Sequence, residues 1–298
     1  MQRKDIEIRI AGTTLRGWLY GPDAAGPVPV VVMAHGFTAV KEMHLDDYAA
    51  VFASAGLGVV AYDHRNFGAS GGEPRQEVDP WQQIRDWRDV ITWATTQPGL
   101  DATRIGVWGS SYAGGHALVL GAIDRRVRCV VSQVPLVSGL ANARRMTRAD
   151  LFAPTRAMFD VDRAQRFAGT APVVIPVVSA DAAVPCALPT ADSLEWFTRT
   201  AQERAPAWKN EVTLRSIEMT TEYEPGAYIA AISPTPLLMV VATGDHLAVS
   251  DIALKAYGQA AEPKRLELLR GGHFDAYTGP GFEQASSAAR DWFVQHLG

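Results

Sequence analysis

The segment Trp108–Gly115 has the sequence WGSSYAGG and follows the short apolar run Ile105–Val107. Small residues continue after it to Ala122, which favours a helix that packs closely against its neighbours. A serine between a strand and a helix, with glycine two positions before it, is typical of a nucleophile elbow. The helix N-terminus then directs its free N–H groups and its positive dipole end towards negative charge that develops near the serine. Ser111 is therefore the candidate nucleophile.

The elbow departs from the usual Gly-x-Ser-x-Gly pattern at one position. Ala113 stands where the second glycine is expected, and Gly114 follows it directly. Alanine is the mildest departure from glycine, because it adds a single methyl group. A Gly/Ser turn between two buried elements explains the segment equally well on its own, so the decision depends on the rest of the chain.

Strands and helices alternate on both sides of this turn. The predicted strands are Ile6–Ile10, Leu15–Tyr20, Pro27–Ala34, Val59–Tyr62, Arg104–Trp108, Val127–Gln133, Pro236–Ala242 and Lys264–Leu269. The predicted helices are Leu45–Ala55, a helix with N-cap Asp79 and first residue Pro80, Gly114–Ala122, Ser250–Ala260 and Phe282–Leu297. Continuous apolar runs such as PVPVVVMA indicate strands that are buried on both faces. The alternation predicts an α/β fold with a doubly wound, mostly parallel sheet joined by right-handed crossovers.

This alternation stops between Pro135 and Pro225, where prolines punctuate the chain. Two helices are predicted in this section, near Asp192–Arg204 and Glu211–Thr220. We expect residues 1–134 and 225–298 to form the core domain and residues 135–224 to form an inserted, mainly helical cap.

Composition argues against several classes of function. The chain has 298 residues, a net charge of -4 and a pI near 6.0, which give no electrostatic basis for binding nucleic acid or acidic membranes. Residues 1–5 lead into an alternating strand rather than an apolar stretch, so no signal peptide is expected, and no apolar run approaches the roughly 20 residues that span a bilayer. Cys129 and Cys186 show no metal-ligand spacing and are expected to be reduced thiols. We expect a cytoplasmic protein without nucleic-acid or membrane partners, and leave open whether it forms a homodimer.

The chemistry of Ser111 requires two further side chains. A serine hydroxyl is a weak nucleophile, so it needs a neighbouring base, and the base needs a carboxylate that orients it. In proteins with this elbow the serine comes first in the chain, the acid second and the histidine last. The strand Leu237–Ala242 leads to Asp245, and the next strand leads to His273 in a glycine-containing loop. Ser111, Asp245 and His273 are therefore predicted to form a catalytic triad.

Other acidic and histidine residues fit these roles less well. Asp275 lies only two residues past the candidate base, and Asp251 is interpreted as a cap of the helix that follows it. His246 is adjacent to the candidate acid and is expected to point the other way. His116 lies one turn into the elbow helix, where a hydrogen-bonded core histidine is the better interpretation. Three more histidines have no supporting context: His44, His64 and His296.

A tetrahedral oxyanion needs two N–H donors. The amide of Tyr112, which follows the nucleophile, is expected to be one of them, and the loop after the third strand should supply the other. That loop contains His35, Gly36 and Phe37. The glycine permits the turn, so the Phe37 amide can face Ser111, while His35 is interpreted as a structural hydrogen-bonding residue.

The segment DHRNFGASGG at residues 63–72 follows a strand but is not a dinucleotide fingerprint, because it lacks the G-x-G-x-x-G spacing. Asp63 and Arg65 are expected to tie this loop together through a buried ion pair or backbone bonds. The sequence has no P-loop, H-E-x-x-H motif or cysteine–histidine cluster. Neither a cofactor nor a metal is therefore expected.

With these motifs assembled, the whole chain resembles the alpha/beta hydrolase superfamily. The resemblance is carried by HGF at 35–37, DHRNFGASGG at 63–72, GSSYAGG at 109–115, TGDHLAVS at 243–250 and GGHFDAY at 271–277. It is greatest to the dienelactone-hydrolase-like and prolyl-oligopeptidase-related serine hydrolases, and it implies an eight-stranded sheet. Dienelactone hydrolase itself uses a cysteine where this chain has Ser111, and the chain has no room for the propeller domain of the prolyl oligopeptidases. Dehalogenases and epoxide hydrolases of the superfamily place aspartate at the elbow, so those chemistries are disfavoured.

The predicted cap is rich in large apolar side chains: Met146, Phe152, Met158, Phe159, Trp196, Phe197, Trp208 and Met219. Most of them should form the core of the cap, and a few should line the cleft, since ligand pockets are mainly apolar. This favours an uncharged acyl or aromatic ester. An arginine cluster at Arg144, Arg145 and Arg148 fits a solvated helix face better than a carboxylate site.

These observations predict a serine hydrolase that cleaves carboxylic esters of small to medium apolar substrates through an acyl-enzyme. Amide or peptide hydrolysis, thioester hydrolysis, cleavage of a C–C bond and acyl transfer remain open on the same triad. A ligand-binding receptor of the same fold is the alternative outside enzymes, although no triad residue is lost.

Overall fold

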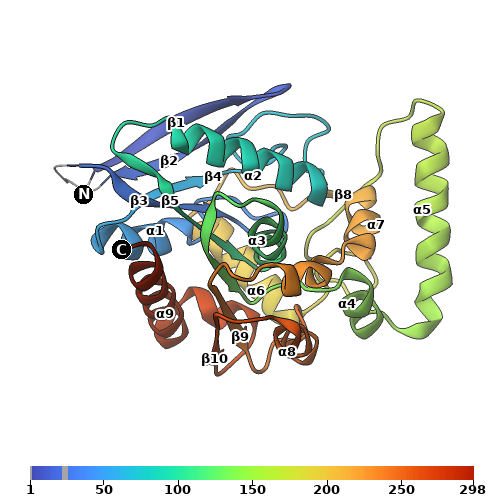
Figure 1. Cartoon of the computed structure of the whole chain (residues 1–298). Helices are drawn as coiled ribbons and strands as arrows, with labels where there is room; N and C mark the ends of the chain where they lie inside the picture. Colours follow the sequence, from blue (N-terminus) through green and yellow to red (C-terminus); the bar gives the residue numbers. More distant parts are fainter. Residues whose placement is uncertain (1, 22–25) are drawn as a thin grey trace.

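The computed structural model describes residues 2–21 and 26–298, so Met1, the first residue of the segment that argued against a signal peptide, lies outside the described residues. Within these residues eight strands form one sheet in the order β1-β2-β4-β3-β5-β6-β9-β10 (Figure 1). Their bounds are β1 (Gln2–Ile10), β2 (Thr13–Gly21), β3 (Val28–Ala34), β4 (Gly58–Tyr62), β5 (Leu100–Ser110), β6 (Val127–Gln133), β9 (Leu237–Ala242) and β10 (Lys264–Leu269). β2 runs antiparallel to both β1 and β4, and the remaining neighbours pair in parallel. The predicted doubly wound, mostly parallel α/β sheet is confirmed.

The central strands are apolar because both of their faces are covered. Every residue of β4 and of β9 is buried, as the continuous apolar runs predicted. Three strands begin two or more residues earlier than predicted: β1 at Gln2 rather than Ile6, β2 at Thr13 rather than Leu15, and β5 at Leu100 rather than Arg104. In the first case the partner strand decides the length, since Gln2 pairs with Gly21 across the hairpin.

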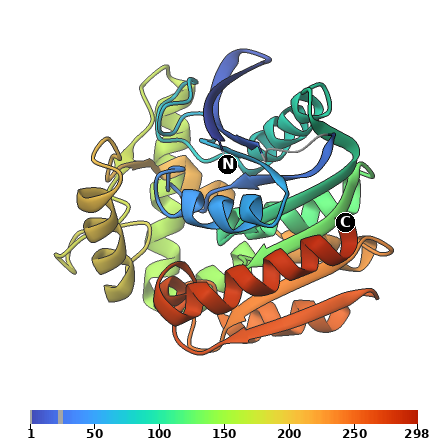
Figure 2. The ribbon, with the colours of Figure 1, turned by 90° about the vertical axis from the view of Figure 1, so that its left-hand side faces the viewer.

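Helices cover both faces of the sheet. The core helices are α1 (Leu45–Ser54), α2 (Pro80–Thr95), α3 (Tyr112–Ile123), α8 (Ser250–Gln259) and α9 (Gly279–Leu297), with the 3-10 turns η2 (Pro225–Ala231) and η3 (His273–Tyr277). α1 and α9 pack side by side on one face (Figure 2), whereas α2 and α3 pack against each other and β5. The predicted start of α2 is confirmed, because the Asp79 side chain accepts a hydrogen bond from the Gln82 N–H.

The section between β6 and η2 contains more helices than predicted. Its elements are α4 (Gly139–Met146), η1 (Ala149–Leu151), α5 (Phe152–Phe167), β7 (Val174–Ile175), α6 (Ala191–Glu203), β8 (Val212–Thr213) and α7 (Leu214–Glu222). α6 lies where a helix was predicted, but α7 begins three residues late because Val212 and Thr213 pair with β7. α4 and α5 were not predicted.

The two missed helices bury little of their surface. Only Gly139 is buried in α4, and only Phe159 and Asp162 are buried in α5. Both sequences nevertheless alternate apolar and polar residues with the period of a helix, so this pattern was present in the sequence although little of the apolar surface is buried. α5 stands apart from the sheet at the edge of the molecule (Figure 1). The division of the chain into a core and a cap comprising residues 135–224 stays a prediction.

None of the helices in the two described ranges has the length and apolar character needed to cross a membrane.

Candidate active site

Ser111 lies at the turn between β5 and α3, as the elbow motif predicted. Its backbone has φ 59 and ψ -117, a conformation that is strained for a residue with a side chain and is typical of functional sites. Its N–H donates to the carbonyl of Gln133 at 2.8 Å, and its carbonyl accepts from the Leu136 N–H at 3.1 Å. These bonds to the neighbouring strand and loop hold the strained turn in place.

Glycine is required before the serine, and the alanine after it is tolerated. A methyl group on Gly109 would collide with the backbone carbonyl of Ala113. Ala113 itself is fully buried and fits, whereas a methyl group on Gly114 would lie 2.9 Å from the carbonyl oxygen of Gln133. In this elbow the second small position has therefore moved by one residue.

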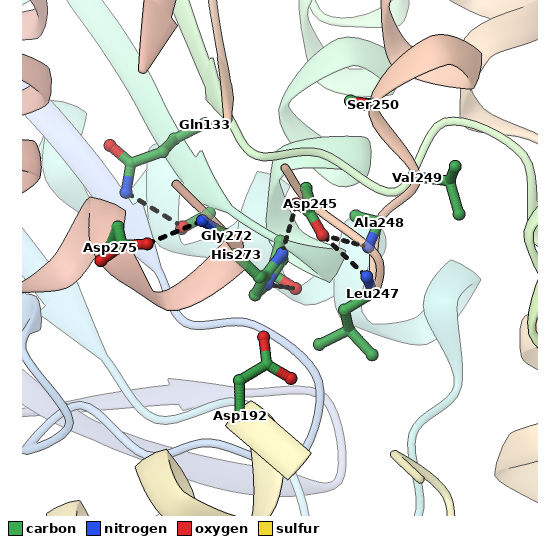
Figure 3. A network of polar contacts seen from close by, with 12 residues as sticks. Gln133, Asp192, Asp245, Leu247, Ala248, Val249, Ser250, Gly272, His273 and Asp275 are labelled. Carbon is green, nitrogen blue, oxygen red and sulfur yellow. Dashed lines mark hydrogen bonds and ion pairs between the residues drawn. The ribbon is translucent and has the colours of Figure 1, made fainter. Parts of the chain in front are cut away.

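The structure brings the three residues of the predicted triad together. The Ser111 hydroxyl lies 3.0 Å from His273 Nε2, and His273 Nδ1 lies 2.7 Å from Asp245 Oδ2. Figure 3 shows His273 and Asp245 pointing towards each other from separate loops. His273 begins η3 after β10, and Asp245 follows β9, so both lie beyond the carboxyl ends of their strands. The contacts are those that general-base activation of a serine requires, while the catalytic roles stay predictions.

The second oxygen of Asp245 is also engaged. Asp245 Oδ1 accepts hydrogen bonds from the N–H groups of Leu247 and Ala248, both at 2.8 Å (Figure 3). The carboxylate is almost fully buried, with 2% of its residue surface exposed. Four directed contacts around one carboxylate and one imidazole leave the histidine ring a single orientation.

Neutral polar groups surround the elbow on its other side. The Ser110 hydroxyl lies 2.6 Å from the Tyr277 hydroxyl and accepts a hydrogen bond from Gln133 Nε2 at 3.2 Å. Burial raises the pKa of the Tyr277 phenol, with the Ser110 hydrogen bond acting in the opposite direction. Burial likewise raises the pKa of the Tyr112 phenol. Both phenols therefore stay uncharged at neutral pH.

The alternative acids do not contact His273 in the described chain. The Asp275 carboxylate accepts from the Gly272 N–H at 2.7 Å and closes the local 3-10 turn (Figure 3). Asp251 was interpreted as the N-cap of α8, and this is wrong: Val249 occupies the N-cap, and Asp251 pairs with Arg145 at 2.7 Å. His246 is exposed, in agreement with its expected orientation away from the triad.

Three other histidines form a buried cluster behind the site. His116 lies 2.8 Å from the Tyr223 hydroxyl and 2.9 Å from Gln83 Oε1, which confirms its interpretation as a core residue. Burial lowers the pKa of His116 to about 3. His35 Nε2 accepts from the His64 N–H at 3.0 Å, so its Nδ1 carries the proton and donates to the Gly36 carbonyl. Burial lowers the pKa values of both His35 and His64, and the rings are neutral structural groups.

The loop after β3 lies directly against the elbow. A methyl group on Gly36 would lie 2.9 Å from Ser111 Cβ. The ring of Phe37 packs edge-on against that of Tyr112, with 5.5 Å between centroids. Within residues 2–21 and 26–298 neither the Phe37 nor the Tyr112 amide donates to a backbone carbonyl. Both amides are thus available to an oxyanion, which keeps their predicted role as a proposal.

Ion pairs tie the loop at residues 63–72 to its surroundings, as expected for a structural loop. The Asp63 carboxylate pairs with Lys41 Nζ at 2.8 Å and accepts from the Ala69 N–H at 2.9 Å. Arg65 pairs with the buried carboxylate of Asp86 at 2.8 Å. Asp63 and Arg65 therefore do not pair with each other. Each forms an ion pair with a residue outside the loop.

A cavity of about 1240 Å³ opens above Ser111. Six of the large apolar residues of the predicted cap line it: Met146, Phe152, Met158, Phe159, Trp196 and Phe197. Charged side chains on α5 also line it, among them Arg163, which pairs with Asp160 and Glu218. The wall of the cavity therefore combines large apolar side chains with charged ones.

Two residues that were not predicted as part of the site contact the loops that carry its candidate residues. Trp208 was assigned to the apolar set of the cap, but its indole N–H donates to the Thr38 carbonyl at 2.8 Å, in the loop that carries Phe37. Asn142 in α4 contacts the backbone beyond Asp245. No spacing signal could have identified them, because each contact joins segments that are far apart in the sequence.

Comparison with known proteins agrees with this geometry. A family model described as X-Pro dipeptidyl-peptidase (S15 family) matches residues 11–275. A thiohydrolase of Eupenicillium brefeldianum is 32% identical over 286 residues, which cover 94% of this chain and 90% of the relative. The polyketide transferase grgF of a Penicillium species is 30% identical over 299 residues, covering 100% of this chain and 98% of the relative.

A solved structure supports the same grouping. The crystal structure of the alpha/beta hydrolase GrgF from Penicillium sp. sh18 superposes with a TM-score of 0.86 at 29% identity, covering 100% of this chain and 99% of the other. The relatives are enzymes of the hydrolase type, and the predicted superfamily is confirmed. This chain belongs to the S15 family, described as X-Pro dipeptidyl-peptidase, within the alpha/beta hydrolase superfamily.

Proposed function

We propose that this protein cleaves an activated acyl derivative, an ester or a thioester, through a covalent acyl-enzyme on Ser111. The observation that carries the proposal is the contact of the Ser111 hydroxyl with His273 Nε2 at 3.0 Å beneath a cavity of about 1240 Å³. The family by itself does not choose among acyl substrates. The chemistry of the elbow and the residues that line the cavity above it narrow the choice.

The proposed mechanism follows from the contacts. The Ser111 oxygen attacks the acyl carbon while its proton passes to His273 Nε2, and Asp245 stabilises the imidazolium through Nδ1. The Phe37 and Tyr112 amides donate to the tetrahedral oxyanion. The proton then moves from His273 to the departing alcohol or thiol, which leaves the acyl group on Ser111.

The second half of the reaction uses the same groups. A water molecule gives a proton to His273 Nε2 and attacks the acyl carbon, and the ester bond to Ser111 breaks with return of the proton to the serine oxygen. The acid product leaves and the enzyme is regenerated. No other group of the site is required to change its charge.

The proposed acyl group is apolar, and residues 135–224 are proposed to act as the cap that encloses it. The six large apolar cap residues that line the cavity support this choice of acyl group. A thioester is supported as the donor by the relatives that are named thiohydrolases. An oxoester differs only in its leaving group, so one triad could serve both.

Acyl transfer is the second candidate function. The relatives named polyketide transferases favour it, because transfer differs from hydrolysis only in the nucleophile that attacks the acyl-enzyme. A hydroxyl acceptor that competes with water would then raise the yield of the new ester. Peptide cleavage is the alternative that the family description raises, and an X-Pro p-nitroanilide tests it.

The experiment compares wild type with Ser111→Ala on p-nitrophenyl acetate, butyrate and octanoate and on octanoyl-N-acetylcysteamine as the thioester. We expect wild-type turnover, and a decrease of roughly 10⁴-fold or more in the variant. The preferred chain length would indicate how much of the cavity the acyl group occupies. Equal turnover by both proteins would show that Ser111 is not the nucleophile. If both were inert on all four compounds, peptide hydrolysis or a receptor function would take precedence.

A further inference from the structure

The turn that follows Asp245 is held from both sides. On one side Asp245 Oδ1 accepts from the N–H groups of Leu247 and Ala248, each at 2.8 Å. On the other side lies Asn142, which belongs to α4 and not to the sheet. Its Nδ2 donates to the Leu247 carbonyl at 2.8 Å, and its Oδ1 accepts from the Val249 N–H at 3.0 Å.

A single peptide group connects these two sets of hydrogen bonds. The Leu247 carbonyl and the Ala248 N–H belong to the same planar unit, so fixing one end fixes the other. Asn142 binds the carbonyl end, and Asp245 accepts from the N–H end. Hydrogen bonds in series also polarise one another, which strengthens the bond to the carboxylate.

We propose that Asn142 is a positioning residue for the acid Asp245 and, through it, for His273. The inference rests on the proposed function, since it assumes that this triad does the chemistry. The hydrogen bonds run without interruption from the Asn142 amide through the Leu247–Ala248 peptide to Asp245, then to His273 and to the Ser111 hydroxyl. Losing the first bond leaves the peptide free to rotate and the carboxylate less firmly held.

The orientation of the Asn142 amide is determined by its partners. Its two backbone partners are a carbonyl and an N–H group, so a flipped amide would oppose like groups at both contacts, and Nδ2 also donates to Met146 Sδ at 3.2 Å. α4 also contacts the first turn of α8, where Arg145 pairs with Asp251 at 2.7 Å. Asn142 also lines the cavity, so the wall that meets the ligand is connected to the acid.

A purely structural role is the competing explanation, and the chain offers a matched control. Asn210 makes the same two kinds of bond to Val178, with its Nδ2 donating at 2.9 Å and its Oδ1 accepting at 3.0 Å. This pair lies in the predicted cap and contacts none of the triad residues. Removing either asparagine side chain deletes two hydrogen bonds to the backbone, but only Asn142 is connected to the acid.

The experiment uses an alkyl fluorophosphonate, which requires an activated serine but no particular acyl group. The Ser111 oxygen bonds to phosphorus, fluoride leaves and His273 takes the serine proton, so the mass of the intact protein reports labelling. Asn142→Leu removes both hydrogen bonds to the turn after Asp245, together with the contact of Nδ2 with Met146 Sδ at 3.2 Å. Asn142→Asp keeps the shape and the acceptor but places a carboxylate oxygen against the Leu247 carbonyl.

We expect both Asn142 variants to lower the maximal labelling rate by about 10- to 100-fold, since small displacements in a catalytic site have effects of this size. The inhibitor constant should stay within about twofold of the wild-type value. Asn210→Leu should label at the wild-type rate although it loses thermal stability. In proton NMR, the low-field signal of the His273 Nδ1–H should shift or broaden in the Asn142 variants and stay in place in the Asn210 variant.

Wild-type labelling by the Asn142 variants would overturn the proposal, as would an equal loss of rate in Asn210→Leu or a change confined to the inhibitor constant. A parallel sample of Ser111→Ala separates this result from failure of the proposed function. If Ser111→Ala were labelled like wild type, the triad would not be the reactive site. The proposed function and the role of Asn142 would then both be wrong.

Discussion

Gly36→Ala is the substitution that tests most directly how the loop after β3 serves Ser111. The added methyl group would lie 2.9 Å from Ser111 Cβ and 3.3 Å from Ser111 Oγ. Carbon atoms in ordinary contact lie about 3.5–4.0 Å apart, so the loop or the serine must move by roughly 0.6 Å or more. Ser111 is held by its bonds to Gln133 and Leu136, and we therefore expect the loop that carries Phe37 to move.

The size of the effect follows from what this loop is proposed to do. A shift of that size lengthens the contact between the Phe37 amide and the oxyanion beyond the range of a good hydrogen bond. Loss of one oxyanion donor lowers kcat by about 10²- to 10³-fold, which corresponds to about 2.7–4 kcal/mol in the transition state. The crowding itself should destabilise the fold by about 1–3 kcal/mol. The activity loss should thus exceed what partial unfolding explains.

Hydrolysis of p-nitrophenyl butyrate, measured together with urea unfolding, checks both parts. Gly258→Ala is the matched control, because it makes the same chemical change in α8 with no atom within 4 Å of the new methyl group. It should keep wild-type kcat and gain up to about 1 kcal/mol from helix propensity. A folded Gly36→Ala protein with wild-type kcat would refute the reasoning, because the loop would then not need its close approach to Ser111.

Three further changes probe the surroundings of the site. Trp208→Phe removes the indole hydrogen bond to the Thr38 carbonyl (2.8 Å). A hydrogen bond of this kind contributes about 1 kcal/mol, so kcat for p-nitrophenyl butyrate should fall by about fivefold. Wild-type kcat would show that this bond does not position the loop. Burial lowers the pKa of His116 from 6.5 to about 3. Between pH 3 and pH 6.5 the unfolded chain therefore binds a proton at His116 that the folded protein does not bind. Stability that is present above pH 6.5 is thus lost as the pH falls towards 3. Urea unfolding at several pH values in this window should show a slope smaller by about 1.4 kcal/mol per pH unit in His116→Gln than in wild type, and equal slopes would contradict the assignment. Arg65→Met leaves the buried Asp86 carboxylate without its ion-pair partner. The free energy of unfolding should fall by about 3–5 kcal/mol, and kcat should stay unchanged. A loss of stability below about 1 kcal/mol would argue against a stabilising role for the pair.

The sequence alone was sufficient to predict the elbow, the mostly parallel sheet and the order of the three candidate side chains along the chain. These features depend on local constraints. The strained turn at Ser111 needs Gly109 before it, and strands buried on both faces must be apolar throughout, so both leave a pattern in neighbouring residues. The positions of Asp245 and His273 follow from the same rule, because the carboxyl ends of parallel strands meet at one edge of the sheet.

Only the tertiary structure decided which cap helices form and which side chains support the site. α4 and α5 carry a helical alternation of apolar and polar residues but bury few of them, so their sequences permit a helix without requiring one. Asn142 and Trp208 form hydrogen bonds to backbone groups that lie 105 and 170 positions away in the sequence. A backbone carbonyl has the same chemistry at every residue, so such a contact leaves no signature in the sequence, and it exists only once packing has brought the two segments together.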